Sequence, residues 1–285
     1  HQAHPVDLAI GTANPHVDFA PGAHLAQKYG VTNAEAAHWE SCADDMTIPY
    51  DDALEVHQQC EAFTLLGAWD FAASVGKYPL LLNYPYYDLY RKQVVKQADL
   101  VFAMYMFGRA FTEEQKLRNF DYYYPLTVRD SSLSACCEAV TAAEVGYPDL
   151  AYDLLAESVF TDLHDLHSNV SSGLHIAALA GAWMDCVAGF GGMRDFGGHI
   201  TFAPRLPPRL TYMSFRMTVR DSKIVVAVDK KTATYRLLSG PKIDLAHHGE
   251  KFTLTAEHPV TRDIAEIEHR EPPKAPVGCE PYHRD

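Results

Sequence analysis

The stretch SSLSACCEAVTAAEVG, residues 131–146, has the spacing of a helix and consists almost entirely of small side chains. Small residues let helix backbones approach one another closely, as a double layer of helices requires. The following stretch, PDLAYDLLAESVFTDL, residues 148–163, is amphipathic and begins with proline, which is typical of a first helical position. Together they predict a buried helix and a helix that covers it.

The same alternation of buried and surface helices continues in both directions and predicts a mainly α domain over residues 23–194. Runs that are apolar nearly all round, at residues 93–108 and 173–192, indicate two more buried helices. Helices are also expected at residues 32–42 and 52–68. The sequence TEEQ at residues 112–115 predicts another helix start, with a capping box.

After Gly192, which with Gly191 is expected to end a helix, the apolar period changes from about 3.6 residues to about 2. The change predicts a small antiparallel, sandwich-like β domain over residues 195–263. Residues 1–22 lack periodicity and are expected to be irregular. The proline-rich tail, residues 264–285, is expected to be disordered.

The composition excludes some classes of partner. With 37 acidic against 24 basic residues, the net charge of -13 opposes binding to nucleic acid or to an anionic membrane. No apolar run approaches the length of a membrane span. The six cysteines lack the spacing of a disulfide framework, and we expect reduced thiols in a cytoplasmic protein.

The sequence RDSS at residues 129–132 stands where the small-residue helix is expected to begin. Asp130 is expected to cap this helix, and the first-turn N–H groups with the hydroxyls of Ser131 and Ser132 would then form a donor pocket suited to phosphate. A simple N-cap with polar first-turn residues is the alternative. Asp130 would repel an anion unless its carboxylate turns toward the backbone.

Three further residues favour a pocket for a sugar and an anion. Lys96 and Gln97 lie in an apolar run, where a charge is costly unless it faces a polar cavity or snorkels to the surface. His175 opens another small-residue helix and would line the same end of the helical layer, unless it is a satisfied core residue. His164 and His167 are interpreted as part of a surface turn, and no metal site is predicted.

Several long motifs resemble glycoside hydrolase family 65, the maltose, trehalose and kojibiose phosphorylases. In chain order they are WESCADDMTIPYD, VVKQADLVFAMYMFG, EEQKLRNFDYYYPLTVRDSSLSACCEAVTAAEVG, SSGLHIAALAGAWMDCVAGFGGM and ITFAPRLPPRLTYMSFRM. The resemblance covers about residues 23–260. It implies part of an (α/α)6 barrel followed by a small β domain.

The resemblance also implies a reaction, the inverting phosphorolysis of an α-glucoside to β-glucose 1-phosphate. Ser131, Ser132 and His175 fall on phosphate-binding positions of the family, and Lys96 and Gln97 fall on positions that contact the glucosyl unit. Inorganic phosphate would be the co-substrate, with no cofactor. Because phosphate is already an anion, it needs only to be held in line with the anomeric carbon.

The chain departs from the family in two respects. The general-acid glutamate of these enzymes lies upstream of WESCADDM, whereas the first glutamate here is Glu35, within the helix leading into that segment. Arg129 stands where many relatives have histidine. We therefore expect a C-terminal portion of such an enzyme, inactive alone, which forms a homodimer or joins a missing N-terminal half. The alternatives are a hydrolase of the same family and a non-catalytic remnant that binds sugar or a partner.

Overall fold

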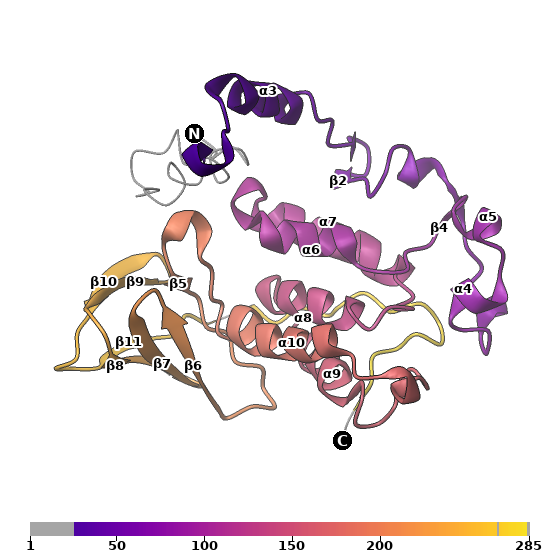
Figure 1. The fold of residues 1–285 in the computed structure, drawn as a ribbon. Helices are drawn as coiled ribbons and strands as arrows, with labels where there is room; N and C mark the ends of the chain where they lie inside the picture. Colours follow the sequence, from indigo (N-terminus) through magenta and orange to yellow (C-terminus); the bar gives the residue numbers. More distant parts are fainter. Residues whose placement is uncertain (1–25, 267, 284–285) are drawn as a thin grey trace.

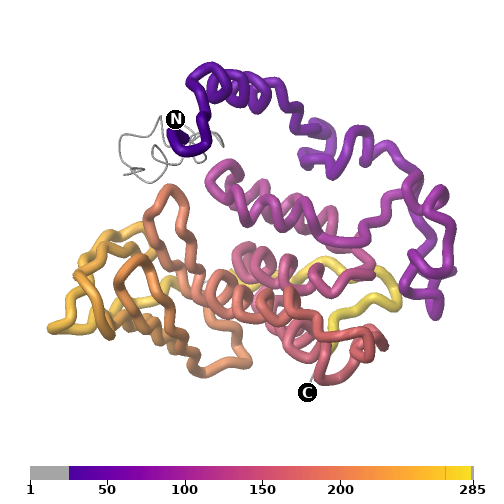
Figure 2. Tube along the Cα trace, viewed as in Figure 1, coloured from indigo at the N-terminus to yellow at the C-terminus, as the bar shows by residue number. Residues whose placement is uncertain are grey.

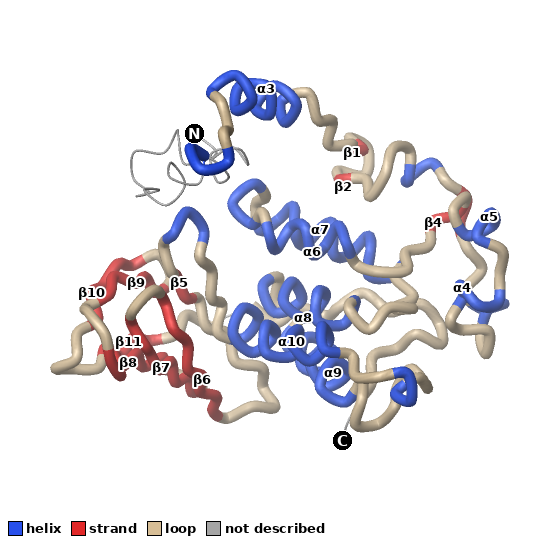
Figure 3. The backbone as a smooth tube through the Cα atoms, viewed as in Figure 1, coloured by secondary structure: helices blue, strands red, loops and turns tan. Residues whose placement is uncertain are grey.

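Most helices and the two larger sheets occupy separate parts of the computed structural model, which describes residues 26–266 and 268–283 (Figures 1 and 3). The helices are α3 (Asn33–Asp44), α4 (Leu80–Asn83), α5 (Tyr86–Leu89), α6 (Asp99–Met106), α7 (Glu113–Tyr123), α8 (Ser134–Glu144), α9 (Pro148–Phe160) and α10 (Ile176–Met184). Four two-residue strands precede the larger sheets and pair as β1-β2 and β3-β4: β1 (Tyr50–Asp51), β2 (Val56–His57), β3 (Gly67–Ala68) and β4 (Lys92–Gln93). The predicted irregular segment 1–22 lies outside the described residues.

Helix α8 forms the centre of the helical part, and every residue from Ser134 to Ala143 is buried. Its small side chains let it pack against α6, α9 and α10. The predicted pairing of a buried helix with a covering helix is therefore confirmed, and α9 begins at Pro148 as expected. The predicted capping box of α7 is confirmed, because Thr112 and Gln115 cap that helix. The helix expected at residues 32–42 is α3, and it also begins with a capping box, formed by Thr32 and Glu35.

The start of α8 differs from the prediction. The helix begins at Ser134 instead of Ser131, because residues 131–133 form a turn in which the Ser134 N–H donates to the Ser131 carbonyl oxygen at 3.1 Å. Asp130 does not cap the helix; Leu133 occupies the cap position. The Asp130 Oδ2 atom instead accepts a hydrogen bond from the Leu81 N–H at 3.3 Å.

Two other helix predictions are wrong in part or entirely. Residues 52–68 form turns, short strands and a 3-10 turn, since the Asp51 side chain accepts hydrogen bonds from the N–H groups of Ala53 and Leu54 and favours a turn over a helix. Only Asp99–Met106 of residues 93–108 is helical. Lys96 and Gln97 consequently lie just before the helix instead of inside it.

Helix α10 continues directly into a π-helix, Asp185–Phe190, and ends at Gly191 and Gly192 as predicted. Gly192 has a φ of +60°, and a Cβ atom there would lie 2.0 Å from the Ala203 carbonyl oxygen. Only glycine therefore fits this reversal. The reversal leads the chain from the helices into the sheets.

The C-terminal part contains the antiparallel strands that the change of period predicted. Strands β6 (Tyr212–Val219), β7 (Ser222–Asp229), β8 (Thr232–Ser239) and β11 (Val260–Asp263) form a sheet in the order β11-β8-β7-β6. Strands β5 (Thr201–Phe202), β9 (Ile243–His247) and β10 (Glu250–Leu254) form a second sheet in the order β10-β9-β5. Tyr235, from the first sheet, is fully buried and its hydroxyl oxygen lies 2.7 Å from Nδ1 of His247 in the second. The two sheets therefore share one core.

The tail, where disorder was expected, is packed over its described residues, 264–266 and 268–283. It first follows the sheets, where the Ile264 N–H donates to the Lys231 carbonyl oxygen at 2.8 Å, and then contacts the helical part. Figure 2 shows it in yellow, returning from the sheets alongside the helices. After β11, the described residues of the tail form no helix or strand. Hydrogen bonds to the helical part hold this segment in place. The Arg270 N–H donates to the Gly146 carbonyl oxygen at 2.9 Å, the Tyr78 hydroxyl donates to the Val277 carbonyl oxygen at 2.9 Å, and Cys279 is buried.

Two further observations concern the cysteines and the length of the helices. All six cysteines are free, which confirms that no disulfide framework is present. Within the described ranges, no helix combines the length and apolar character needed to cross a membrane.

Candidate functional site

A short backbone pairing brings two of the predicted groups of site residues together. The Val95 N–H donates to the Leu126 carbonyl oxygen at 2.8 Å, and the Val128 N–H donates to the Val95 carbonyl oxygen at 2.9 Å. This bridge pairs Val95 with Thr127 in parallel. The residues that follow each strand-like segment therefore lie next to each other, with Lys96 and Gln97 on one side and residues 129–132, which we call the serine loop, on the other.

Ser131 and Gln97 are in direct contact. The Ser131 hydroxyl donates to the Gln97 Oε1 atom at 2.8 Å, and the Gln97 Nε2 atom donates to the Asp99 Oδ1 atom at 2.6 Å. Both side chains are half-buried, as is that of Ser132. The arrangement places a hydroxyl of the predicted phosphate site against an amide of the predicted glucosyl site.

Lys96 is exposed, which fits the alternative that its side chain reaches the surface from the apolar run. Its carbonyl oxygen lies 3.4 Å from the Ser134 hydroxyl, which donates to it. Its ammonium group acts on Asp130 through space and favours the charged carboxylate. A cation therefore stands beside the serine loop on the solvent side.

Asp130 turns toward the backbone, as an anion site beside it would require. Its carboxylate faces the N–H groups of Leu80 and Leu81, away from solvent. Burial raises the pKa of Asp130, although these N–H groups, Lys96 and His167 all favour its charged form. Burial favours the neutral acid, and the hydrogen bond from Leu81 turns the carboxylate toward the backbone. Each of these reduces the repulsion that Asp130 would exert on an anion held by the neighbouring hydroxyls.

His175 is the N-cap residue of α10 and is held by Asp162. The His175 N–H donates to Asp162 Oδ2 at 3.0 Å, and the His175 Nδ1 atom lies 2.6 Å from Asp162 Oδ1. The hydrogen bond with His175 holds the pKa of Asp162 below its ordinary value. A carboxylate at Nδ1 fixes the proton on that nitrogen and leaves Nε2 to face a ligand.

His167 connects the two helix ends and was missed as a site residue. Its ring centroid lies 5.8 Å from that of His175, and it interacts electrostatically with Asp130. Burial lowers the pKa of His167, and its Nε2 atom is buried without a hydrogen-bond partner in the described structure. Asp165 folds the intervening turn by accepting hydrogen bonds from the N–H groups of Asn169 and Val170. This turn brings His167 and His175 together.

The structure brings two of the predicted site residues, Ser131 and Gln97, into direct contact. His175, at the N-terminal end of α10, lies beside His167, which acts on Asp130 of the serine loop electrostatically. His164, in contrast, lies apart and has its Nδ1 atom 2.7 Å from the Tyr282 hydroxyl. The structure shows no direct contact between Ser132 and His175. Among the described residues, no three His, Cys, Asp or Glu side chains gather as a metal-binding group.

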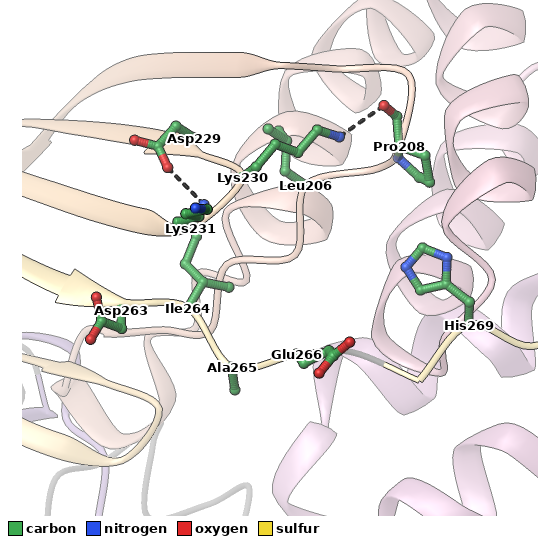
Figure 4. Close-up of a pocket in the computed structure, with 10 residues that line it drawn as sticks. All are labelled: Leu206, Pro208, Asp229, Lys230, Lys231, Asp263, Ile264, Ala265, Glu266 and His269. Carbon is green, nitrogen blue, oxygen red and sulfur yellow. Dashed lines mark hydrogen bonds between the residues drawn. The ribbon is translucent and has the colours of Figure 1, made fainter.

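A cavity of about 1000 Å³ lies elsewhere, between the sheets and the tail (Figure 4). Its lining mixes charges of both signs, including Asp229, Lys231, Glu266 and His269. Lys230 is already engaged, because its Nζ atom donates to the carbonyl oxygens of Pro207 and Pro208, each at 2.8 Å. None of the predicted site residues lines this cavity.

Comparisons with known proteins agree with the division into helices and sheets. The profile of the Glycosyl hydrolase family 65 central catalytic domain matches residues 8–184, and that of the Glycosyl hydrolase family 65, C-terminal domain, matches residues 193–254. An uncharacterized glycosyl hydrolase of Mycobacterium tuberculosis is 47% identical over 262 residues, which are 91% of this chain and 33% of that protein.

Relatives with a named activity are more distant. The alpha,alpha-trehalose phosphorylase of Geobacillus stearothermophilus is 36% identical over 239 residues, covering 84% of this chain and 31% of that protein. A solved structure from the human microbiome, assigned as a kojibiose phosphorylase, has the same fold with a TM-score of 0.76 at 24% identity, over 87% of this chain and 36% of that one. The chain therefore spans about a third of the length of these relatives, and it belongs to glycosyl hydrolase family 65.

Proposed function

We propose that this chain is the phosphate-binding portion of an inverting α-glucoside phosphorylase, which converts a disaccharide and phosphate into β-glucose 1-phosphate and a free sugar. The contact between Ser131 and Gln97 carries the proposal, because it joins the phosphate and glucosyl positions within one hydrogen bond of 2.8 Å. The phosphorylases among the relatives support the same reaction class.

In this mechanism the serine loop and α10 hold the nucleophile. To hold phosphate, the Ser131 hydroxyl would turn from Gln97 Oε1 to a phosphate oxygen and the Ser132 hydroxyl would donate to another. With its proton on Nδ1, His175 would accept a hydrogen bond at Nε2 from the protonated oxygen of hydrogen phosphate. Gln97 and Lys96 bind the glucosyl hydroxyls, so that the phosphate stands in line with the anomeric carbon. The departing sugar oxygen needs a proton from a carboxylic acid, and the family's general-acid glutamate is expected outside this chain.

The remaining barrel helices would cover an apolar face of α10. Ile176, Leu179 and Trp183 are spaced along one face of this helix and are 66%, 39% and 52% exposed. Such a face calls for a packing partner. We propose that the other helices of an (α/α)6 ring, from the same protein or from an associated chain, provide it.

The dependence of turnover on phosphate tests the proposed reaction. The full-length protein is incubated with trehalose, maltose or kojibiose, and both free sugar and glucose 1-phosphate are measured as phosphate is titrated. A phosphorylase forms the two products in equal amounts and stops without phosphate. The isolated 285-residue chain is expected to be inactive in the same assay. Robust turnover by that chain alone would contradict the claim that it is only a portion of the catalytic unit.

A hydrolase of the same family is the second candidate. Asp130, a half-buried carboxyl group with a raised pKa beside Ser131, could serve as the base that activates water if its carboxylate turned away from the Leu81 N–H. Under this alternative, glucose release is independent of phosphate and falls strongly in Asp130→Asn. A non-catalytic role remains the third alternative, and it requires that the full-length protein turns over no α-glucoside.

A further inference from the structure

A buried arginine lies directly before the serines of the proposed phosphate site. Arg129 is only 5% exposed and has a left-handed backbone, with φ of +49°. Non-glycine residues adopt this conformation at a cost of about 1 kcal/mol or more unless the surroundings hold them there. Something in the structure must therefore stabilise this residue.

Two carboxyl groups and an aromatic ring surround the guanidinium group. The Arg129 Nε atom lies 3.4 Å from Glu157 Oε1 on α9, and the Arg129 Nη1 atom lies 3.7 Å from Glu138 Oε2 on α8. The guanidinium carbon also lies 5.7 Å from the ring centroid of Tyr124. The side chain thus spans two helices that flank the serine loop.

The charges of this group balance when one carboxyl group keeps its proton. Glu138 is fully buried, and burial raises its pKa to about 8 despite the attraction of Arg129. At neutral pH the Glu157 carboxylate then faces the guanidinium cation as its charged partner. The separations of 3.4 and 3.7 Å between the guanidinium group and the two carboxyl groups are long. A buried ion pair is weak evidence for a gain in folding stability, which leaves room for another role of this arginine.

The C-terminal tail orients Glu157. The Tyr282 N–H donates to the Glu157 Oε2 atom at 3.1 Å, which leaves Oε1 to face Arg129. Cys279 of the tail also lies close enough to interact electrostatically with both Arg129 and Asp130. The contacts therefore run from the tail through Glu157 and Arg129 to the serine loop.

We propose that Arg129 is a positioning residue, whose guanidinium group, buried between the carboxyl groups of Glu138 and Glu157, keeps the left-handed turn that presents Ser131 and Ser132 to phosphate. This inference rests on the proposed function. It gives the tail a part in the same site, although the tail lies more than a hundred residues further along the chain. Arg129 itself is not expected to touch the phosphate.

Arg129→Met in the full-length protein tests the proposal, with Arg194→Met as a matched control. Arg194 is also largely buried and pairs with a glutamate, but at the opposite end of α8. Calorimetric titration with inorganic phosphate should show a dissociation constant raised about tenfold in Arg129→Met and changed by less than about twofold in Arg194→Met. The KM for disaccharide should change far less than the KM for phosphate. Arg129→Lys, which keeps the charge, should recover part of the affinity.

Melting temperatures separate positioning from a general loss of stability. If Arg129→Met and Arg194→Met melt at similar temperatures and bind phosphate equally well, Arg129 is only structural and the proposal is wrong. Should Arg129→Met fail to fold, Glu157→Gln replaces it, with phosphate affinity about threefold weaker expected and unchanged affinity contradicting the proposal. If the wild-type protein does not bind phosphate, the proposed function itself fails, which is a distinguishable result.

Discussion

Two glutamates of α8, Glu138 in its N-terminal half and Glu144 at its C-terminal end, each face an arginine from outside the helix, but they pair with it differently. At the C-terminal end, Glu144 accepts hydrogen bonds from Lys116 at 2.7 Å and from Arg194 at 2.9 Å. At the N-terminal end, Glu138 and Arg129 approach only to 3.7 Å, and no described residue hydrogen-bonds to either carboxyl oxygen of Glu138. Glu144 thus forms close ion pairs, whereas Glu138 only lies near its arginine.

The carboxyl pKa values follow the pairing. Burial would raise the pKa of Glu144, but the charges of Arg194 and Lys116 hold this pKa below its ordinary value. Burial dominates at Glu138 and raises its pKa to about 8. Strongly shifted groups that are not fully paired cluster at functional sites, whereas removing one partner of a closely paired buried group is strongly destabilising. The contrast supports our proposal that the serine loop, beside Glu138, belongs to the site, and we expect Glu144 to matter for stability.

Neutralising each glutamate gives the largest contrast. Glu144→Gln leaves Lys116 and Arg194 without their buried counter-charge and should lower the free energy of unfolding by about 3 kcal/mol. Glu138→Gln should cost less than about 1 kcal/mol at pH 7, because Glu138 already carries a proton there. Urea unfolding of both variants measures the difference. Equal losses would show that the two ends do not differ.

The pH dependence of Glu138 gives the next effect. Its pKa is higher in the folded protein than its ordinary value of 4.5, so its contribution to stability is complete below pH 4.5 and is lost as pH rises through about 8. Between pH 6 and pH 8, wild type should lose about 2 kcal/mol relative to Glu138→Gln. Arg129, Glu157 and Cys136 all act on this carboxyl group and stay the same in the variant. A constant difference between the two proteins across this range would contradict the raised pKa.

Removing one hydroxyl from the serine loop tests the site directly. Ser131→Ala deletes a donor to phosphate and the contact to Gln97, and it should raise the KM for phosphate about tenfold. Ser222→Ala is the control, since this buried serine of β7 donates to the Pro241 carbonyl oxygen within the sheets. Similar phosphate KM values in the two variants would remove Ser131 from the site.

The tail should give the smallest effect. Tyr282→Pro removes the N–H that donates to Glu157 and should weaken phosphate binding about twofold to threefold. Tyr282→Ala keeps that N–H while losing the hydroxyl contact with His164, so it separates the two contacts. Phosphate affinity that falls equally in both variants would show that the N–H has no special part.

Local sequence patterns predicted the parts of the fold that depend on neighbouring residues. The capping box of Thr112 and Gln115, the start of α9 at Pro148 and the alternation in β6 all follow from short-range hydrogen bonding or periodicity. The predicted helix at residues 52–68 is wrong because the Asp51 side chain competes for backbone N–H groups, which apolar content does not reveal.

The site could be predicted only in part for the same reason. Ser131 and Gln97 stand out by residue type, but their contact depends on the pairing of Val95 with Thr127. His167 and Asp162 were missed because a loop, not a periodic element, carries them to His175. The packing of the tail depends on Glu157 and Gly146, more than a hundred residues away, and no local pattern could indicate it.

The proposed phosphate site can be tested by a crystal structure of the full-length protein with inorganic phosphate. We expect a phosphate within hydrogen-bond distance of the Ser131 hydroxyl and of His175 Nε2, beside the Gln97 amide. A phosphate bound away from the serine loop, with no contact to Ser131 or His175, would show that the site lies elsewhere.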